Sequence, residues 1–170
     1  MTEFLVAIGS NLGDRMALIR EAMDQVEARC GLITACSSLY ETAPVGAADQ
    51  SFLNGAFMVR SGLRPEDLLR SLLAIEKGLG RTREVHWGNR TIDLDIAMAI
   101  DESGNAVNIM QPGLQIPHPR MLERDFVLVP AAEIGGSWIH PATGKTLAAE
   151  SAARFPQGLR STPVTREARA

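Results

Sequence analysis

Hydrophobic and polar residues are arranged along several short segments of this chain as they are in β-strands. A short continuous apolar run is typical of a buried strand, and strict alternation is typical of a strand with one buried face. Both patterns occur here, separated by turns that contain glycine, proline and aspartate. The predicted strands are residues 4–8, 32–40, 52–60 and 91–96, and the last continues to residue 100.

Two intervening segments have the three- and four-residue spacing of apolar side chains that indicates an amphipathic helix. The first follows Asp14, the predicted N-cap, and ends before Gly31, the predicted C-cap. The second occupies residues 65–79, where Pro65 fits the first helical turn. The predicted buried faces are Ile19, Ala22, Met23 and Val26 in the first helix, and Leu68, Leu69, Leu72, Leu73 and Ile75 in the second.

Smaller elements are predicted after residue 100. Pro117 and Pro119 restrict the backbone around them and stiffen one loop. From residue 156 onward the chain is polar and is expected to form a loose tail at residues 156–170. The other expected elements are a pairing strand at 106–110, one or two short helical turns within 121–134, a turn region at 138–146 and a short helix at 147–155.

The order strand, helix, strand, strand, helix, strand matches the ferredoxin-like βαββαβ core of an α+β fold. We therefore predict a single domain at residues 1–155, with no internal repeats. Its core would be an antiparallel sheet with helices on one face, extended by a C-terminal hairpin and short helices. The face of the sheet away from the helices is then free to carry a site.

Composition narrows the classes of partner. Of the 170 residues, 45% are hydrophobic and 22% charged, as in ordinary globular domains. The formal net charge of −3 disfavours broad nucleic-acid binding, which needs a basic face. Cys30 and Cys36 lack metal-ligand spacing and suit a reducing compartment. Because we find neither a secretory leader pattern nor an apolar run of spanning length, we expect a cytoplasmic protein that does not bind membranes.

Two aspartates in the last predicted strand are the first indication of chemistry. Ile92, Leu94 and Ile96 point to one face of that strand. Asp93 and Asp95 point to the other face, roughly 6.6 Å apart along the strand. At an effective dielectric constant near 20 the two carboxylates repel each other by about 2.5 kcal/mol. A hard cation such as Mg²⁺ would offset this repulsion, and it usually binds one or two carboxylates together with substrate phosphates.

Basic residues crowd the segment before these aspartates. Arg81, Arg83 and Arg90 lie there together with Trp87. Arginine binds phosphate oxygens in a bidentate geometry, so these side chains are suited to hold a triphosphate. The alternative is a solvated strand face whose acids form surface salt bridges, and the aspartate pair alone leaves both interpretations open. The neighbouring arginines favour the triphosphate site.

Asn54 is the polar residue that stands out in the predicted strand at 52–60. A buried amide must be hydrogen-bonded, and it can offer both a donor and an acceptor to a flat heterocycle. It can equally satisfy a neighbouring backbone group. On this observation alone, the structural interpretation is the better one.

Six motifs occur in a fixed order. They are GSNLG at 9–13, YETAPVG at 40–46, FLN at 52–54, RTR at 81–83 with WG at 87–88, RTIDLD at 90–95 and IPHPR at 116–120. Together they resemble the 6-hydroxymethyl-7,8-dihydropterin pyrophosphokinase family of the folate pathway. The resemblance covers residues 3–135, and the string at 90–96 is highly specific for it. The chain departs from the common family pattern at His86 and Asn89.

The resemblance implies transfer of the intact β,γ-diphosphate of ATP to the hydroxymethyl group of the pterin, with release of AMP. It implies two Mg²⁺ ions held by Asp93 and Asp95, and catalytic roles for Arg83, Arg90 and Asp95. The implied ATP-binding residues are Glu76, Arg81, Arg83, Arg90, Ile96, His118 and Arg124. The implied pterin pocket consists of Thr42, Ala43, Val45, Phe52, Asn54, Trp87 and Phe126, with Phe126 stacked on the ring and Asn54 reading its polar edge.

Phosphoryl-type transfer asks a protein mainly for positioning and for charge opposite the phosphate oxygens. Our hypothesis is a direct in-line attack of the substrate hydroxyl on the β-phosphorus, with Asp95 helping to remove the hydroxyl proton. The arginine-bearing segment at 81–88 is expected to act as a lid that excludes water. The expected partners are ATP and the pterin, and we expect a monomer that can contact other enzymes of the folate pathway.

Two other classes of function remain to be weighed. A ferredoxin-like binding module for RNA would need exposed aromatic residues on its central strands and a basic face, but the chain has one tyrosine and is acidic. A regulatory module for amino acids would have no use for an aspartate pair beside arginines. Another Mg²⁺-dependent nucleotide transferase is excluded only by the pterin-pocket residues, which rest on the resemblance.

Overall fold

The computed structural model describes residues 1–42, 51–80, 92–159 and 163–164. Six strands form one antiparallel sheet in the order β5-β1-β4-β3-β8, and β2 also pairs with β4. The predicted strand at 32–40 is divided into two strands. The strands are β1 (Thr2–Ser10), β2 (Leu32–Cys36), β3 (Leu39–Thr42), β4 (Phe52–Ser61), β5 (Asp93–Ile100) and β8 (Pro163–Val164).

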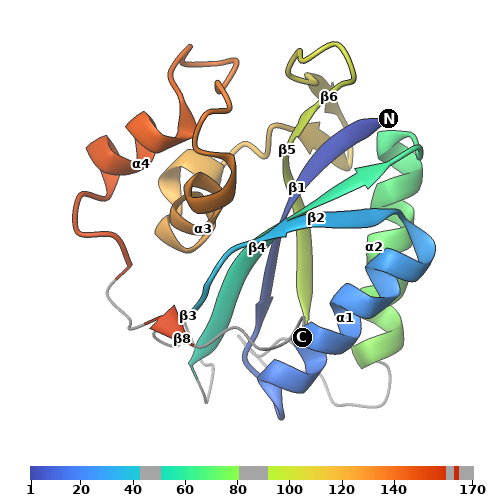
Figure 1. Cartoon of the computed structure of the whole chain (residues 1–170). Coiled ribbons are helices and arrows are strands. Elements are labelled where there is room, and N and C mark those ends of the chain that lie inside the picture. Colours follow the sequence, from blue (N-terminus) through green and yellow to red (C-terminus); the bar gives the residue numbers. More distant parts are fainter. Residues whose placement is uncertain (43–50, 81–91, 160–162, 165–170) are drawn as a thin grey trace.

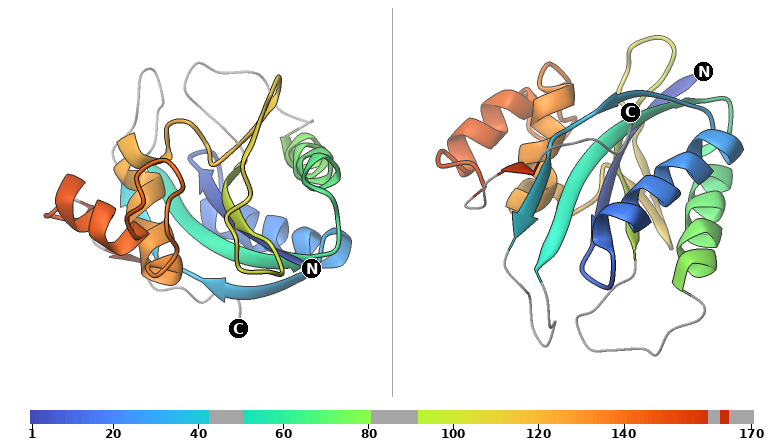
Figure 2. Two further views of the ribbon diagram at one scale, coloured as in Figure 1. Left: turned by 90° about the horizontal axis from the view of Figure 1, so that it is seen from above. Right: turned by 60° about the horizontal axis from the view of Figure 1, so that its bottom comes forward.

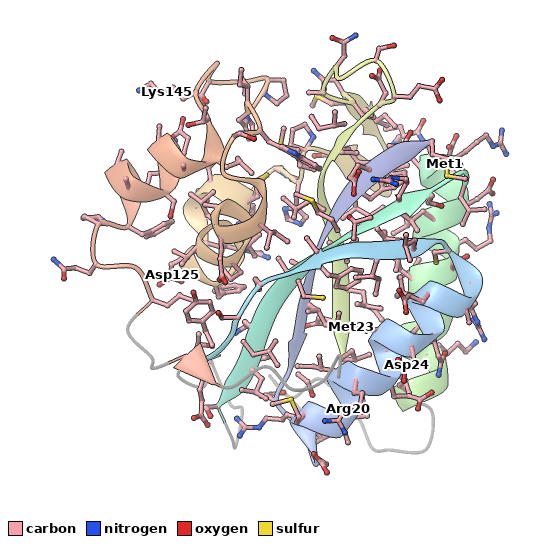
Figure 3. The ribbon with its side chains drawn as sticks, viewed as in Figure 1. Met1, Arg20, Met23, Asp24, Asp125 and Lys145 are labelled. Carbon is pink, nitrogen blue, oxygen red and sulfur yellow. The ribbon has the colours of Figure 1, made fainter. Side chains whose placement is uncertain are left out.

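Helices α1 (Arg15–Arg29) and α2 (Pro65–Gly80) lie side by side on one face of the sheet (Figure 1). The predicted N-cap is confirmed, because Asp14 Oδ1 accepts a hydrogen bond from the Ala17 amide at 3.1 Å. Figure 3 shows Met23 pointing from α1 toward the sheet, whereas Arg20 points away from it.

The predicted apolar faces of both helices are buried except at two positions of α2, Leu69, which is partly buried, and Leu73. Leu68, Leu72 and Ile75 of α2 are fully buried. Leu73 is 52% exposed, so its predicted burial is wrong. The reason is geometric: Leu73 lies about 100° around the helix axis from Leu72, beyond the stripe that meets the sheet.

The other face of the sheet carries a second pair of helices, α3 (Asp125–Gly135) and α4 (Leu147–Arg154) (Figures 1 and 2). The prediction that helices cover one face only is therefore wrong. The segment at 121–134 forms a short 3₁₀ helix (Met121–Glu123) followed by the full helix α3, which is longer than the predicted turns. The short helix predicted at 147–155 is confirmed as α4.

Two cores result, one on each face of the sheet. Phe4, Val6 and Ile8 of β1 pack with α1 and α2 in the first core. Leu5 and Ala7 point the other way and pack with α3 in the second core. Because α3 and α4 cover only part of this second face, the sheet continues beyond them toward the end of β1.

The C-terminal segments differ in detail from the predictions. The hairpin is formed by β6 (Ile109–Gln111) and β7 (Leu114–Ile116), whereas Ala106 makes a single bridge to Ile100. Within the predicted loose tail, β8 pairs with β3 and extends the sheet (Figure 1). In the part of the chain that the structure describes, no helix is long and apolar enough to cross a membrane.

Candidate functional site

A cavity of about 480 Å³ opens on the second face of the sheet, beside α3. Its floor comes from β1, β3, β4 and β5, and its wall from the segment that leads into α3. Residues far apart in sequence therefore meet here. The lining residues are Ala7, Ile8, Gly9, Thr42, Phe52, Asn54, Asp93, Asp95, Arg120, Arg124, Phe126 and Val127.

The aspartate pair lies at one end of this floor. Asp93 pairs with Gly9 across the β1–β5 ladder, and Asp95 pairs with Ala7. Both carboxylates line the cavity, whereas Leu94 between them is buried in the first core. The predicted segregation of acids and apolar residues to opposite faces of this strand is confirmed. Asp95 is exposed and Asp93 half-buried, so both remain accessible to a ligand in the cavity.

Asn54 lies at the other end of the floor and is 7% exposed. Its Nδ2 donates a hydrogen bond to Thr42 Oγ1 at 2.7 Å. The amide is therefore satisfied in part by another cavity-lining side chain. The Thr42 hydroxyl proton stays available to a ligand, because Thr42 Oγ1 is the acceptor in this bond. Phe52, which begins β4 opposite Thr42, adds an aromatic surface to the same end.

Gly9 sits between these two ends. It pairs with Asn54 on one side and with Asp93 on the other, so the three residues form one row across three neighbouring strands. A Cβ atom at Gly9 would lie 2.5 Å from Asn54 Oδ1, closer than real Cβ contacts allow. The absence of a side chain at this position leaves the Asn54 amide in place and the floor of the cavity flat.

The wall of the cavity is cationic and aromatic. Arg124 Cζ lies 5.8 Å from the centroid of the Phe126 ring, within the range of a cation–π contact. Arg120 is exposed, and its Nε lies 3.8 Å from Glu123 Oε1. That ion pair is open to solvent at both partners and is therefore weak. Both arginines can turn positive charge toward an anionic ligand.

His118 lies beside this wall. Its amide donates to Ala97 O at 2.8 Å, and its Nδ1 accepts from the Arg120 amide at 3.1 Å. Because Nδ1 accepts, the neutral ring carries its proton on Nε2. Burial lowers the pKa of His118 below the ordinary histidine value, the Asp95 carboxylate opposes that shift, and the nearby guanidinium groups add to it. The imidazole is thus favoured in its neutral form near pH 7.

Three predicted ATP-binding residues in the described part of the chain do not line the cavity: His118, which lies beside its wall, and also Glu76 and Ile96. Glu76 lies on α2, and its Oε2 accepts a hydrogen bond from the Leu94 amide at 2.6 Å. It therefore holds the backbone of β5 between the two aspartates. The Ile96 side chain is 5% exposed and packs in the first core, on the face of β5 opposite Asp95. The Ile96 side chain therefore does not face a ligand in this cavity.

Six predicted site residues lie outside the described part of the chain. They are Ala43, Val45, Arg81, Arg83, Trp87 and Arg90. Among the described residues no cluster of three or more histidine, cysteine, aspartate or glutamate side chains could hold a metal ion.

Sequence reasoning missed two lining residues that have clear signals. Gly9 belongs to the GSNLG motif, where a glycine at the end of a buried strand indicates close approach of another group. Arg120 belongs to the IPHPR motif, directly after the stiff loop. Ala7, Ile8 and Val127 carry no chemical signal of their own, since small and aliphatic residues in strands and helices are usually core.

One cavity thus brings together paired carboxylates, two arginines and an aromatic ring beside a hydrogen-bonded amide. This combination is typical of an enzyme that binds a phosphorylated nucleotide next to a flat heterocycle. Residues 5–136 match the family model described as 7,8-dihydro-6-hydroxymethylpterin-pyrophosphokinase (HPPK). The chain belongs to this family, and it is an ATP-dependent diphosphotransferase.

Curated relatives agree with the family match. The chain is 48% identical over 131 residues to the 2-amino-4-hydroxy-6-hydroxymethyldihydropteridine pyrophosphokinase of Bacillus subtilis, covering 76% of this chain and 75% of the relative. It is 38% identical over 153 residues to the protein of the same name from Methylorubrum extorquens, covering 85% and 94%. The "Folate synthesis bifunctional protein, mitochondrial" of Pisum sativum is 39% identical over 142 residues, covering 83% of this chain and 27% of that protein.

Solved structures share the fold. A structure of HPPK-DHPS in complex with substrates superposes with a TM-score of 0.71 at 13% identity, covering 92% of this chain and 44% of the other. Plasmodium falciparum HPPK-DHPS with pterin and p-hydroxybenzoate gives a TM-score of 0.71 at 15% identity, covering 94% and 45%. This chain therefore spans less than half the length of those structures, and the likeness concerns the mixed α/β fold with its antiparallel sheet.

Proposed function

We propose that this protein transfers the β,γ-diphosphate of ATP to the hydroxymethyl group of 6-hydroxymethyl-7,8-dihydropterin in folate biosynthesis. AMP and the pterin diphosphate would be the products. The names of the curated relatives support the pyrophosphokinase activity and the pterin substrate. The antiparallel β5-β1-β4 order, with β2 and β3 beside β4, supports the ferredoxin-like form of the fold.

The row Asn54–Gly9–Asp93 is the observation that carries the proposal. Its outer members are two strand spacings apart, or about 9.6 Å. A bicyclic pterin lying over Gly9 would place its polar edge near Asn54 and its hydroxymethyl group near the aspartates. Phe52 of β4 and Phe126 of α3 offer apolar surfaces for the ring. The acceptor and the phosphate donor would then meet at the aspartate end.

The residues present fit Mg²⁺. Asp93 and Asp95 supply hard oxygen ligands from one strand face, and this ion usually takes one or two carboxylates while substrate phosphates complete its coordination. Two bound Mg²⁺ ions would neutralise the triphosphate and polarise its β-phosphorus.

The reaction requires the protein to position the two substrates and to neutralise the negative charge of the phosphate oxygens. The hydroxymethyl oxygen forms a bond to the β-phosphorus, the bond from that phosphorus to the oxygen bridging it to the α-phosphorus breaks, and AMP leaves with that oxygen. We assign the acceptance of the hydroxyl proton to Asp95, an exposed carboxylate in the cavity. We assign hydrogen bonds to phosphate oxygens to Arg124, which lines the cavity, and to the neutral His118, which has a proton on Nε2.

The catalytic roles of Arg83 and Arg90 rest on the sequence motifs, since both lie outside the described residues. Arg83→Ala is expected to slow the chemical step more than it weakens substrate binding, because its charge acts on the transition state. Single-turnover rates and equilibrium titrations of both substrates separate the two effects. Equal losses in rate and in affinity would contradict this role.

Some proteins of the same fold are fused to a second enzyme, and this fusion suggests a partner for the present chain. The structures named HPPK-DHPS join two enzymes in one chain. That arrangement supports the proposal that this chain, which we propose to be a monomer, contacts another enzyme of folate synthesis. The fusion of the two enzymes in those relatives does not bear on which reaction we propose for the cavity.

The test of the proposed function is the identity of the nucleotide product. Protein, ATP, Mg²⁺ and the hydroxymethyl dihydropterin should yield AMP, separated from ADP by ion-exchange chromatography. Omitting the pterin should abolish AMP formation. ADP as the product would indicate a different Mg²⁺-dependent transferase, and pterin-independent AMP would indicate hydrolysis, so either result contradicts the proposal.

A further inference from the structure

A polar cluster at the start of α1, away from the cavity face of the sheet, joins three segments that are distant in sequence. Arg15 Nη1 donates to Glu41 Oε2 at 3.0 Å and to the Ser51 hydroxyl and carbonyl oxygens, each at 2.9 Å. Ser51 Oγ donates in turn to Glu41 Oε2 at 2.7 Å. We call these three residues the arginine clamp. They close a ring of hydrogen bonds in which every member contacts the other two.

The clamp adjoins the cavity without lining it. Arg15 is the first residue of α1, Glu41 is the next-to-last residue of β3, and Ser51 directly precedes β4. The residues that follow Glu41 and Ser51 are Thr42 and Phe52, which pair with each other and line the cavity. Because side chains alternate along a strand, Glu41 points away from the cavity face that Thr42 occupies.

The clamp ties this pair of strand ends together through four hydrogen bonds, with Glu41 47% exposed. Hydrogen bonds between charged partners are roughly twice as strong as neutral ones. Arg15 is 23% exposed, so solvent screens it less than a free surface arginine. The Ser51 hydroxyl and the Arg15 guanidinium lower the pKa of Glu41, so the carboxylate stays charged at neutral pH.

Without the clamp, the ends of β3 and β4 would be held mainly by their mutual pairing. Strand ends open more readily than strand centres, because fewer contacts restrain them. Movement there would displace Thr42, and through the bond from Asn54 Nδ2 to Thr42 Oγ1 it would also displace Asn54. The phosphate end of the cavity rests on β5 and on the segment before α3, which the clamp does not touch.

We propose that the arginine clamp (Arg15, Glu41 and Ser51) is a positioning element that fixes Thr42 and Phe52 for the heterocyclic acceptor, and that it leaves the nucleotide half of the cavity unaffected. This inference rests on the proposed function. It predicts that loss of the clamp weakens binding of the pterin and leaves binding of ATP unchanged. If loss of the clamp leaves about one molecule in ten with both residues in place, the acceptor binds roughly tenfold more weakly.

The experiment compares Arg15→Ala with Arg70→Ala, a control that removes an exposed arginine ion pair on α2. Equilibrium titrations measure the dissociation constants of the pterin and of Mg²⁺·ATP, and thermal unfolding confirms that the variants fold. Arg15→Ala should raise the pterin dissociation constant roughly tenfold and change that for ATP by less than about twofold. Arg15→Lys should recover part of the affinity, and Arg70→Ala should change neither constant.

A double-mutant cycle and hydrogen exchange complete the test. The effects of Arg15→Ala and Glu41→Gln should be strongly non-additive, because both break the same ring of bonds. Amide exchange at Thr42 and Phe52 should accelerate in Arg15→Ala and not in Arg70→Ala. This readout needs no substrate, so it still tests the clamp if the wild-type protein forms no AMP and the proposed function itself fails.

Two results would overturn the inference. One is an unchanged pterin affinity and unchanged exchange in Arg15→Ala. The other is an equal loss of pterin and ATP affinity, since a general loosening of the fold would not distinguish the two halves of the cavity.

Discussion

A glycine, Gly9, determines the shape of this cavity as much as its charged residues do. Gly9 lies between the amide of Asn54 and the carboxylate of Asp93, and the strand register fixes all three. Charged and amide groups give a site its chemistry, but they act only where a ligand can approach the backbone between them. A glycine at the centre of the row provides that approach.

Gly9→Ala is predicted to weaken pterin binding by about tenfold or more, because the added methyl group would displace Asn54 Oδ1. Gly62→Ala is the matched control, since the nearest atom to its added Cβ, Met1 Cε, is 4.0 Å away. Calorimetric titration with the pterin measures both variants. If Gly9→Ala binds the pterin as the wild type does, the flat floor is not required for binding.

For single residues, the sequence predicts the features that depend on neighbouring positions in the chain. Alternation places Asp93 and Asp95 on the face opposite Leu94, and the structure confirms it. Gly9 and Arg120 were missed, because their roles depend on which segments fold beside them. That information is tertiary and is absent from any short window of sequence.

Elements with a clear period are the ones that sequence predicts well. Helices α1 and α2 follow from the spacing of their apolar residues, and both are confirmed. Helix α3 has a nearly continuous apolar run at 126–131 and a proline at its sixth position. Such a run has no period that separates helix from strand, and proline usually ends a helix. Its length was therefore underestimated.

The orientation of α2 can be tested with two adjacent leucines. Leu72 is fully buried, and Leu73 is 52% exposed. Leu72→Ala should lower the free energy of unfolding by about 2–5 kcal/mol, since it leaves a cavity in the core. Leu73→Ala should change it by less than about 1 kcal/mol. Urea denaturation measures both, and similar losses in the two variants would contradict the observed rotation of the helix.

The connection between α3 and α4 contains a buried histidine. His140 is 5% exposed; its Nδ1 accepts from the Ala142 amide at 3.1 Å, and its Nε2 has no hydrogen-bond partner among the described residues. Burial lowers its pKa, Glu150 opposes that shift, and Arg154 adds to it. The folded state therefore disfavours the protonated imidazole.

This depressed pKa makes stability depend on pH. An unfolded histidine titrates near pH 6.5, so the contribution of His140 is complete above that value. It is lost as the pH falls below about 6.5 toward the lower pKa of the folded state. His140→Asn, whose Oδ1 can still accept from Ala142, should flatten the pH dependence of the free energy of unfolding below about pH 6.5. An identical pH dependence in wild type and variant would contradict this prediction. His118, whose pKa is lowered as well, contributes to the slope that remains in the variant.

In the described part of the chain a sheet lies between two helical layers, and the cavity opens where α3 and α4 leave the second face of the sheet uncovered. Helices α1 and α2 seal one face, whereas α3 and α4 cover only part of the other. The order of elements along the chain predicted the first layer. It did not predict the second, because the packing of α3 on β4 joins segments that are far apart in sequence.

Phosphorus NMR of a complete reaction distinguishes transfer of a diphosphate group from transfer of a single phosphate. Wild-type protein with Mg²⁺, ATP and the hydroxymethyl dihydropterin should convert the three ATP signals into the single signal of AMP and the two coupled signals of a diphosphate ester. Asp93→Asn and Asp95→Asn, folded by circular dichroism, should reduce the rate more than about 100-fold. Signals of ADP and a pterin monophosphate, or full activity in both aspartate variants, would contradict diphosphate transfer at this cavity.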